Sequence, residues 1–493
     1  MNKLSNNVKK NLDTLKSMYG NSGDIVTREI TINKKKVGYI YLESVSSDDK
    51  ISDFLMKDLS SYTKFKKIGF FENLLDSLEN SIPNSHFGII QTFDEIPLKL
   101  SAGYTCVFVE GYNKGFSLET KATIDRGVTE ATTETIIRGP KDSFTENHAI
   151  NLGLIRKRIK DSNLWMEDIF VGTRSKTKIT ISYIQDVADL KMVKKLKQKI
   201  ENIDIDGIID SGYIRDFLIK NRTSAFPQLI STERPDLASS SLLLGKIVIL
   251  VENTPFVLII PAVLSDFLHS PEDCYQKSIN ANFIRILRII AFLITILLPG
   301  LYIALTTFNQ EIIPDELLIS LAVQREGVPF PTAIETLMMI ITFEILRESD
   351  IRIPSASGSA IGIVGALVLG EAAVTAGVVS PIVIIVIGVT SISGLLFYDV
   401  DFVNGIRCWR IVFILFSSIM GILGFIVAAL LFTIKLSSME FEEIPYLAPL
   451  SPFYLDDQKD SLVRAPRYEM FKRPTYLKPK NKVKMRDNNE TKN

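Results

Sequence analysis

The sequence has few of the residues and none of the motifs on which common enzyme and metal sites depend. Its 493 residues include three cysteines and three histidines, which lie far apart in the chain. Cys106, Cys274 and Cys408 form no CxxC pair, so neither a zinc site nor a disulfide framework is indicated. The motifs GxxxxGK[ST], GxSxG and HExxH are absent. We therefore expect a protein that is not an enzyme and that holds no metal or cofactor.

Net charge is also missing, because 56 Lys and Arg residues balance 56 Asp and Glu residues. The overall charge therefore indicates no nucleic-acid partner. The first twenty residues are polar and contain no apolar core, which argues against a cleavable signal peptide. We accordingly expect the N-terminal region to lie in the cytoplasm.

Apolar residues are abundant but unevenly distributed. Mean hydropathy is +0.19 although 23% of the residues are charged, and the long uncharged runs all lie between Ile289 and Lys435. We expect an α/β subdomain at 1–133, a second α/β subdomain with a membrane-proximal hairpin at 134–265, a transmembrane domain at 266–435 and a basic cytoplasmic tail at 436–493. The predicted fold class is thus an α/β N-terminal region of two small subdomains, followed by an α-helical transmembrane domain.

The N-terminal half shows the two periodicities of an α/β protein. Short runs alternate apolar and polar residues, which predicts strands, and longer runs have helical spacing. The expected strands are Ile25–Leu42 (two), Cys106–Glu110, Phe116–Thr123, Lys178–Ile184 and Gly245–Pro261 (two, at a sheet edge or near the membrane). The expected helices are Lys50–Leu78, Asn147–Ile159, Asp189–Ile200 and Gly212–Lys220.

About four membrane spans are predicted. Ile289–Gln310 and Ile411–Ile434 carry no charge and are long enough to cross a bilayer. Ile353–Tyr398 would be roughly twice the hydrocarbon thickness as one helix, so we expect a hairpin that turns near Ser380. Pro331–Glu348 contains internal carboxylates, and it is either an interfacial or re-entrant helix or a full span.

The basic tail orients these spans. From Lys459 onward the chain has eleven Lys and Arg residues and four Asp and Glu residues, which places the tail in the cytoplasm by the positive-inside rule. Both termini inside require an even number of crossings, and four satisfy this. With four crossings, however, Arg407 and Arg410 fall on the outer side, against the same rule.

Small residues line one face of the first hairpin helix. Gly358, Gly362, Ala366 and Gly370 repeat every four residues, which lets another helix approach closely. This ridge packs either against the second helix of the hairpin or against an identical subunit.

Another face of the same helix carries Val364, Val368, Glu371 and Thr375. Glu371 is the one charged residue in the 46 residues of Ile353–Tyr398, and such a group is costly in a membrane unless it faces water or a partner. It is either a structural glutamate or part of a carboxylate ring in a cation pore that valines constrict. In the soluble half, the basic end of Arg138–Ile159 either binds phosphate or lipid headgroups or forms a salt-bridged surface.

Over nearly its whole length the chain resembles the A subunit of the GerA-type nutrient germinant receptors of endospore-forming bacteria. The resemblance rests on long strings that occur in the same order. These are RGPKDSFTEN (Arg138–Asn147), LIRKRI (Leu154–Ile159), GTRSKTKITISYI (Gly172–Ile184), DIDGIIDSGYI (Asp204–Ile214), TPFVLIIP (Thr254–Pro261), LLPGLYIALTTFNQEIIPDELL (Leu297–Leu318), REGVPFPTAIE (Arg325–Glu335) and IGIVGALVLGEAAVTAGVVSP (Ile361–Pro381).

The resemblance implies a receptor subunit in the inner membrane of the spore. Such a subunit forms a homo-oligomer, taken to be a pentamer, that opens on nutrient binding and releases monovalent cations. Its implied partners are a transporter-like B subunit that binds the nutrient, a lipoprotein C subunit and membrane lipid.

Two other functions stay open from the residues themselves. One is a secondary transporter in which Glu371 takes part in proton coupling, and the other is a membrane-anchored scaffold for the receptor complex. Four spans are few for a transporter, and Ile289–Gln310 and Ile411–Ile434 show no inverted repeat.

Overall fold

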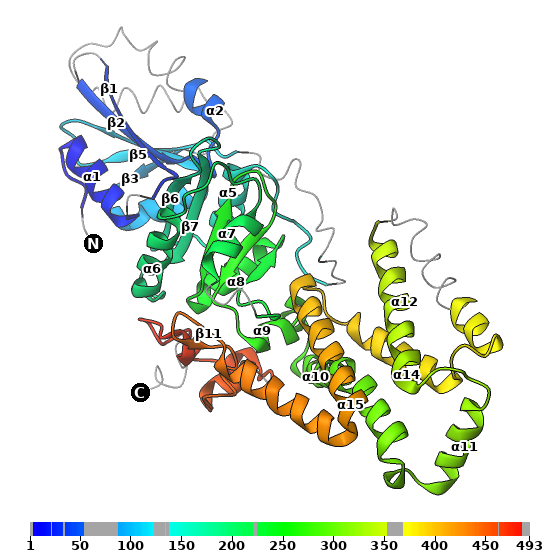
Figure 1. Ribbon diagram of the computed structural model, residues 1–493. Coiled ribbons are helices and arrows are strands. Elements are labelled where there is room, and N and C mark those ends of the chain that lie inside the picture. The colour runs from blue at the N-terminus through cyan, green and yellow to red at the C-terminus, as the bar shows by residue number, and fades with distance from the viewer. Residues whose placement is uncertain are drawn as a thin grey trace, which may run out of the picture. The chain divides into compact units, whose positions relative to one another are not determined.

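A computed structural model gives the fold of the chain (Figure 1). It describes residues 3–20, 22–32, 35–53, 87–122, 134, 138–219, 224–352, 368–461 and 463–485. The chain divides into two compact units, which are described separately. The first consists of Met1–Lys220, Leu229–Pro261 and Met470–Asn493, and the second of Asn221–Gln228 and Ala262–Glu469.

The first unit contains two five-stranded antiparallel sheets with helices. In spatial order, the strands of the first sheet are β1 (Ile25–Ile32), β2 (Lys35–Leu42), β4 (Tyr104–Val109), β5 (Gly115–Glu119) and β3 (Phe87–Ile90). Its helices are α1 (Val8–Met18), α2 (Asp48–Asp53) and α4 (Ile96–Ser101). A Cβ at Gly38 would lie 2.4 Å from Val8, so glycine is needed where α1 crosses β2. The predicted strand pair Ile25–Leu42 is confirmed as β1 and β2, whereas the predicted helix Lys50–Leu78 is described only at its start.

In spatial order, the strands of the second sheet are β6 (Leu164–Val171), β7 (Thr177–Ile184), β9 (Ile247–Val251), β10 (Val257–Ile260) and β8 (Ile230–Thr232). The helices of this part are α5 (His148–Arg158), α6 (Leu190–Glu201), α7 (Ser211–Leu218) and α8 (Pro235–Leu244). Gly245–Pro261 forms two strands as predicted, but the prediction that they lie at a sheet edge is wrong. β9 and β10 are inner strands and every residue in them is buried, which explains their uninterrupted apolar sequence.

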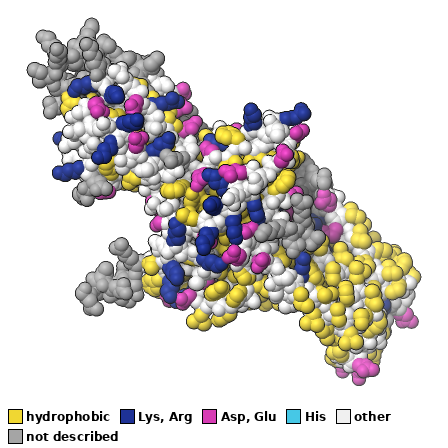
Figure 2. All heavy atoms as spheres, turned by 60° about the vertical axis from the view of Figure 1, so that its left-hand side comes forward, with side chains coloured by type: hydrophobic (Ala, Val, Ile, Leu, Met, Phe, Trp, Pro, Cys, Tyr) yellow, Lys and Arg dark blue, Asp and Glu magenta, His cyan; other side chains and the backbone are white. Residues whose placement is uncertain are grey.

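The second unit is mainly helical. Its helices are α9 (Leu264–Leu268), α10 (Ser278–Ile303, continued by a π-helical turn at Ala304–Phe308), α11 (Asp315–Arg325), α12 (Thr332–Arg352), α14 (Pro381–Gly394) and α15 (Val400–Ser438), and a short hairpin of β11 (Glu440–Phe441) and β12 (Ile444–Pro445) follows α15. Ser278–Phe308 and Val400–Ser438 are long and apolar enough to cross a membrane, and Pro381–Gly394 is a shorter apolar helix. Hydrophobic side chains crowd the outer surface of this unit, with few charged ones among them (Figure 2).

Helix α15 is sharply bent, and this corrects the prediction of one continuous span over Ile411–Ile434. Gly421 has φ 57° and ψ −134°, which breaks the helix into a first leg (residues 400–420) and a second leg (residues 422–438). The ring centroids of Trp409 and Phe432 lie 5.1 Å apart, and those of Phe413 and Phe425 lie 5.3 Å apart. In a straight helix Trp409 and Phe432 would be about 35 Å apart, so the two legs fold back on each other.

Helix α10 runs alongside the first leg in the same direction. Phe292 stacks on Phe402 with a centroid distance of 5.7 Å, and a Cβ at Gly300 would lie 3.1 Å from Phe413. Beyond the end of α10, Asn309 Oδ1 accepts a hydrogen bond of 3.1 Å from the backbone N–H of Ile422. The bend therefore lies at the C-terminal end of α10. Both polar ends of α15 lie near the N-terminal half of α10.

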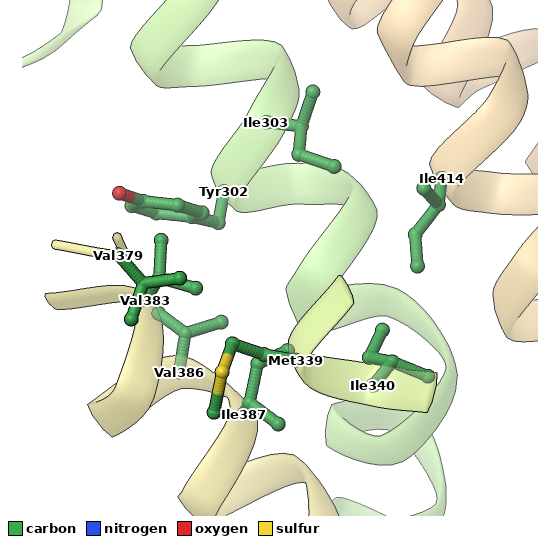
Figure 3. Close-up of a cluster of buried hydrophobic side chains, with 9 residues drawn as sticks. All are labelled: Tyr302, Ile303, Met339, Ile340, Val379, Val383, Val386, Ile387 and Ile414. Carbon is green, nitrogen blue, oxygen red and sulfur yellow. The ribbon is translucent and has the colours of Figure 1, made fainter. Parts of the chain in front are cut away.

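The core of the helical unit joins four helices. Figure 3 shows its buried side chains, which come from α10, α12, α14 and α15 and from the turn before α14: Tyr302, Ile303, Met339, Ile340, Val379, Val383, Val386, Ile387 and Ile414. Beside α10, Gly394 approaches Thr295 at the end of α14, whereas Ser380 at its start binds the first turn of α12. These contacts fix the direction of each helix in the bundle.

Candidate functional site

The predicted functional face of the hairpin helix is only partly described. Residues 368–375 are helical, and Val368, Glu371 and Thr375 are all exposed, with 54% of Val368 accessible. Their spacing of three and four residues places them on one face, which we call the exposed face. Thr375 donates its hydroxyl proton to the backbone oxygen of Glu371 at 2.8 Å. Val364 lies outside the described residues.

The ridge of small residues is represented by Gly370. It is buried, and a Cβ on it would lie 3.7 Å from Ile384 of α14. At this position the ridge packs within the chain, against the second helix of the hairpin. Gly358, Gly362 and Ala366 lie outside the described residues.

A buried carboxylate anchors the turn between residues 368–375 and α14. Glu335, in the first turn of α12, accepts hydrogen bonds from the backbone N–H of Ser380 at 3.0 Å and from its hydroxyl at 2.9 Å. Arg325 lies 3.8 Å from the same carboxylate. Sequence reasoning missed this role, because Glu335 was weighed only as a charge that opposes membrane crossing.

A second buried carboxylate lies beside the N-terminal half of α10. Asp273 is fully buried, and Arg288 donates two hydrogen bonds of 2.8 Å to its two oxygens. Arg285 Nε lies 3.3 Å from Asp273, and Arg285 Nη1 donates a hydrogen bond of 3.0 Å to the backbone oxygen of Asp460. Burial opposes ionisation of Asp273, but Arg288, the backbone N–H of Ser270 and Arg285 together outweigh burial and hold the pKa of this carboxyl below its usual value.

This polar cluster also binds the C-terminal tail. His269 Nε2 lies 2.7 Å from the backbone oxygen of Ser461, and the Arg464 guanidinium binds the backbone oxygens of Gln276 and Cys274. Burial and the nearby Arg285 lower the pKa of His269 to about 3, so the imidazole is neutral at pH 7. The tail is thus fastened to the segment that leads into α10.

The basic helix of Arg138–Ile159 forms α5, and the structure supports the salt-bridged interpretation. Arg156 is fully buried and binds both oxygens of Asp24 at 2.9 Å, and Arg158 binds Asp142 at 2.6 Å. Burial opposes ionisation of Asp24, but Arg156 and the hydroxyls of Ser44 and Ser22 together outweigh burial and hold the pKa of the carboxyl below its usual value. Neither arginine is available as a phosphate ligand.

A polar pocket of about 350 Å³ lies beside this ion pair in the first unit, with Glu43, Glu146, His148, Lys178 and Glu252 among its lining residues. Burial lowers the pKa of His148 to about 4, so His148 is neutral at pH 7. Its Nε2 lies 2.7 Å from the Thr180 hydroxyl. Among the described residues, no group of three His, Cys, Asp or Glu side chains is placed to hold a metal ion.

Comparison with known proteins identifies the family. The sequence profile described as Bacillus/Clostridium GerA spore germination protein matches residues 13–476. The chain belongs to this family. It is 36% identical to spore germination protein KA of Bacillus subtilis over 98% of this chain and 88% of that protein, and 34% identical to the B. subtilis membrane protein YfkQ over 96% and 91%.

The GerA-family chain also resembles a solved structure, the N-terminal domain of the A subunit of the Bacillus megaterium spore germinant receptor GerK3. Identity is 31%, the match covers 53% of this chain and 97% of that one, and the TM-score is 0.42. The predicted resemblance to GerA-type A subunits is confirmed by the family match. The chain is a spore germination receptor A subunit and a membrane protein, and its family comprises germination proteins rather than enzymes.

Proposed function

We propose that this A subunit assembles with identical copies into a ligand-gated cation channel of the spore inner membrane. The observation that carries the proposal is the exposed face, which presents Val368, Glu371 and Thr375 outward from an apolar helical unit. A carboxylate in such surroundings needs water or a partner. A ring of subunits would supply a water-filled axis, concentrate negative charge on it and close it at the valines.

The other subunits of the receptor complex are inferred from membership of the GerA family. We propose that a B subunit binds the nutrient, that a lipoprotein C subunit completes the complex, and that monovalent cations pass when the channel opens. The pentameric ring expected from the resemblance belongs to the same proposal.

The helix directions support six crossings rather than the four predicted from hydropathy. α10 runs toward the bend of α15, and α12 runs from Glu335 back to Glu344, which binds Arg410 of the first leg. The chain must return before Ser380, after which α14 and the two legs of α15 give three more passes. α12 has 21 residues, about 31 Å of helix, which suffices to cross. Both termini then lie in the cytoplasm, and Arg407 and Arg410 no longer violate the positive-inside rule.

The native Cys408 distinguishes these topologies. With six crossings it lies on the cytoplasmic side, and with four it lies outside. We expect an impermeant thiol reagent to leave Cys408 unmodified in intact cells and to label it after permeabilisation. A cysteine replacing the exposed Ala376 should show the reverse, with labelling in intact cells. Labelling of Cys408 in intact cells would contradict six crossings.

The channel hypothesis predicts opposite effects for two variants of the exposed face. Val368→Ser should hydrate the constriction and give leak currents in reconstituted complexes and premature germination of spores. Glu371→Gln should preserve assembly but lower cation conductance and slow germination, because the ring loses its negative charge. Conductance in planar bilayers and germination assays measure both effects.

Matched controls are Val389→Ser, an exposed valine of α14, and Glu311→Gln, an exposed glutamate after α10. We expect neither to change conductance. If Val368→Ser were silent and Glu371→Gln left ion preference unchanged, the exposed face would not line a pore. Proton-coupled uptake without channel currents would favour a transporter, and normal signalling without any ion flux would favour a scaffold.

A further inference from the structure

Three arginines gather where α12 meets the first leg of α15, and we call them the arginine cluster. Glu344 of α12 binds Arg407 Nε at 3.0 Å and Arg410 Nη2 at 2.5 Å. Arg347 lies close enough to interact electrostatically with both of these arginines and with Glu348. The cluster thus holds three guanidinium groups against two carboxylates.

The charge of the cluster is incompletely balanced by the described residues. Arg410 is 5% exposed, and its Nε has no hydrogen-bond partner in the described parts of the chain. A guanidinium is always charged in proteins and presents five donors in a plane. A buried donor of this kind is costly unless an acceptor reaches it, and an anionic oxygen is the best acceptor.

Exposed apolar side chains lie beside the cluster on both helices. Ile341 and Ile345 are exposed on α12, and Ile411 and Leu415 are exposed on α15, within one or two turns of the arginines. Cations next to an exposed apolar surface match a ligand that has an anionic head and hydrocarbon chains.

The cluster lies where the first leg of α15 changes from polar to apolar sequence, because its uncharged part begins at Ile411, directly after Arg410. Trp409 lies between two of the arginines in sequence and packs on Phe432 of the second leg, close to Lys435. Basic residues and tryptophan at helix ends are typical of the membrane–water interface, and basic pockets between membrane helices bind anionic headgroups.

We propose that the arginine cluster binds the phosphate of an anionic phospholipid, whose acyl chains lie along the exposed isoleucines and leucine of α12 and α15. Arg347 and Arg407 contact the headgroup, and Glu344 holds Arg407 and Arg410 in position while it weakens their attraction for the lipid.

The test measures lipid retained by the purified full chain, by native mass spectrometry in neutral detergent after exchange with phosphatidylglycerol or phosphatidylcholine. We expect a preference for phosphatidylglycerol that falls roughly fivefold for each arginine removed in Arg347→Gln and Arg407→Gln. Lys435→Gln removes the same charge from the second leg of α15 and should leave the preference unchanged.

Glu344→Gln should have the opposite effect to the arginine variants. It removes the carboxylate that competes with the lipid phosphate, and so it should increase retention of phosphatidylglycerol. A merely structural ion pair predicts no such increase, and an unchanged or reduced retention would overturn the proposal. Equal retention of the two lipids by the native chain, or an equal effect of Lys435→Gln, would do the same. Inorganic phosphate that displaces phosphatidylglycerol at similar concentration would indicate a site for free phosphate instead.

Discussion

Alanine at Gly421 should open the fold-back of α15 and abolish the germination response. Gly421 combines φ 57° with ψ −134°, a conformation that costs a residue with a side chain about 1–3 kcal/mol. A Cβ there would also lie 2.5 Å from Phe308 Cβ and 2.9 Å from Asn309 Oδ1, at the point where α10 ends. Both effects push the chain toward a straight helix and separate the two legs.

The separation can be measured by cross-linking. Cysteines at Trp409 and Phe432, in a chain with Cys274 and Cys408 replaced by serine, should be joined by a short bifunctional thiol reagent, and Gly421→Ala should prevent this cross-link. Gly388→Ala is the matched control, since a Cβ at Gly388 meets nothing within 4 Å. Efficient cross-linking in Gly421→Ala would show that the bend does not depend on glycine.

The bend marks the boundary of what hydropathy could predict. An apolar run gives the length of a segment and its preference for lipid, and the apolar parts of α10 and α15 lie where uncharged runs predict them. An apolar run does not give the direction of the chain, because Gly421 is one of several glycines in apolar sequence. The residues that pack against the bend, Phe308 and Asn309, lie more than 110 residues earlier in the chain. The length of Ile353–Tyr398 predicts a hairpin near Ser380. The uncharged part of α15, Ile411–Ile434, is only long enough for one span, so its length predicts no turn.

The polar sites show the same division. The helices α5 and α6 could be predicted because the helical period is visible within about ten residues of sequence. Their N-terminal caps, Asn147 and Asp189, are also local. Glu335 with Ser380, Asp273 with Arg288 and Asp24 with Arg156 are pairs whose partners lie 15 to 132 residues apart. A lone carboxylate in an apolar or basic context signals that a partner exists, but a single sequence does not say which residue it is.

Removing the charge of Asp273 should have the largest effect on stability. Asp273→Asn keeps the size of the side chain but leaves Arg285 and Arg288 buried beside a neutral group. Breaking a buried ion pair in this way costs about 3–5 kcal/mol, which lowers the Tm of the detergent-solubilised full chain by roughly 10 °C. The tail should also loosen, because Arg285 joins Asp273 to Asp460. Faster proteolysis around residue 460 would report this loosening.

The pH dependence separates lost charge from general damage. The pKa of Asp273 is lower in the folded chain than in the unfolded chain, so its contribution to stability is complete above about pH 4 and is lost as the pH falls further. The difference in Tm between the native chain and Asp273→Asn should therefore shrink below about pH 4. Asp94→Asn, which changes an exposed aspartate, should leave Tm unchanged throughout. If Asp273→Asn matched this control at pH 7, the two arginines would not depend on Asp273, and the tail would be held to α10 by its backbone contacts alone.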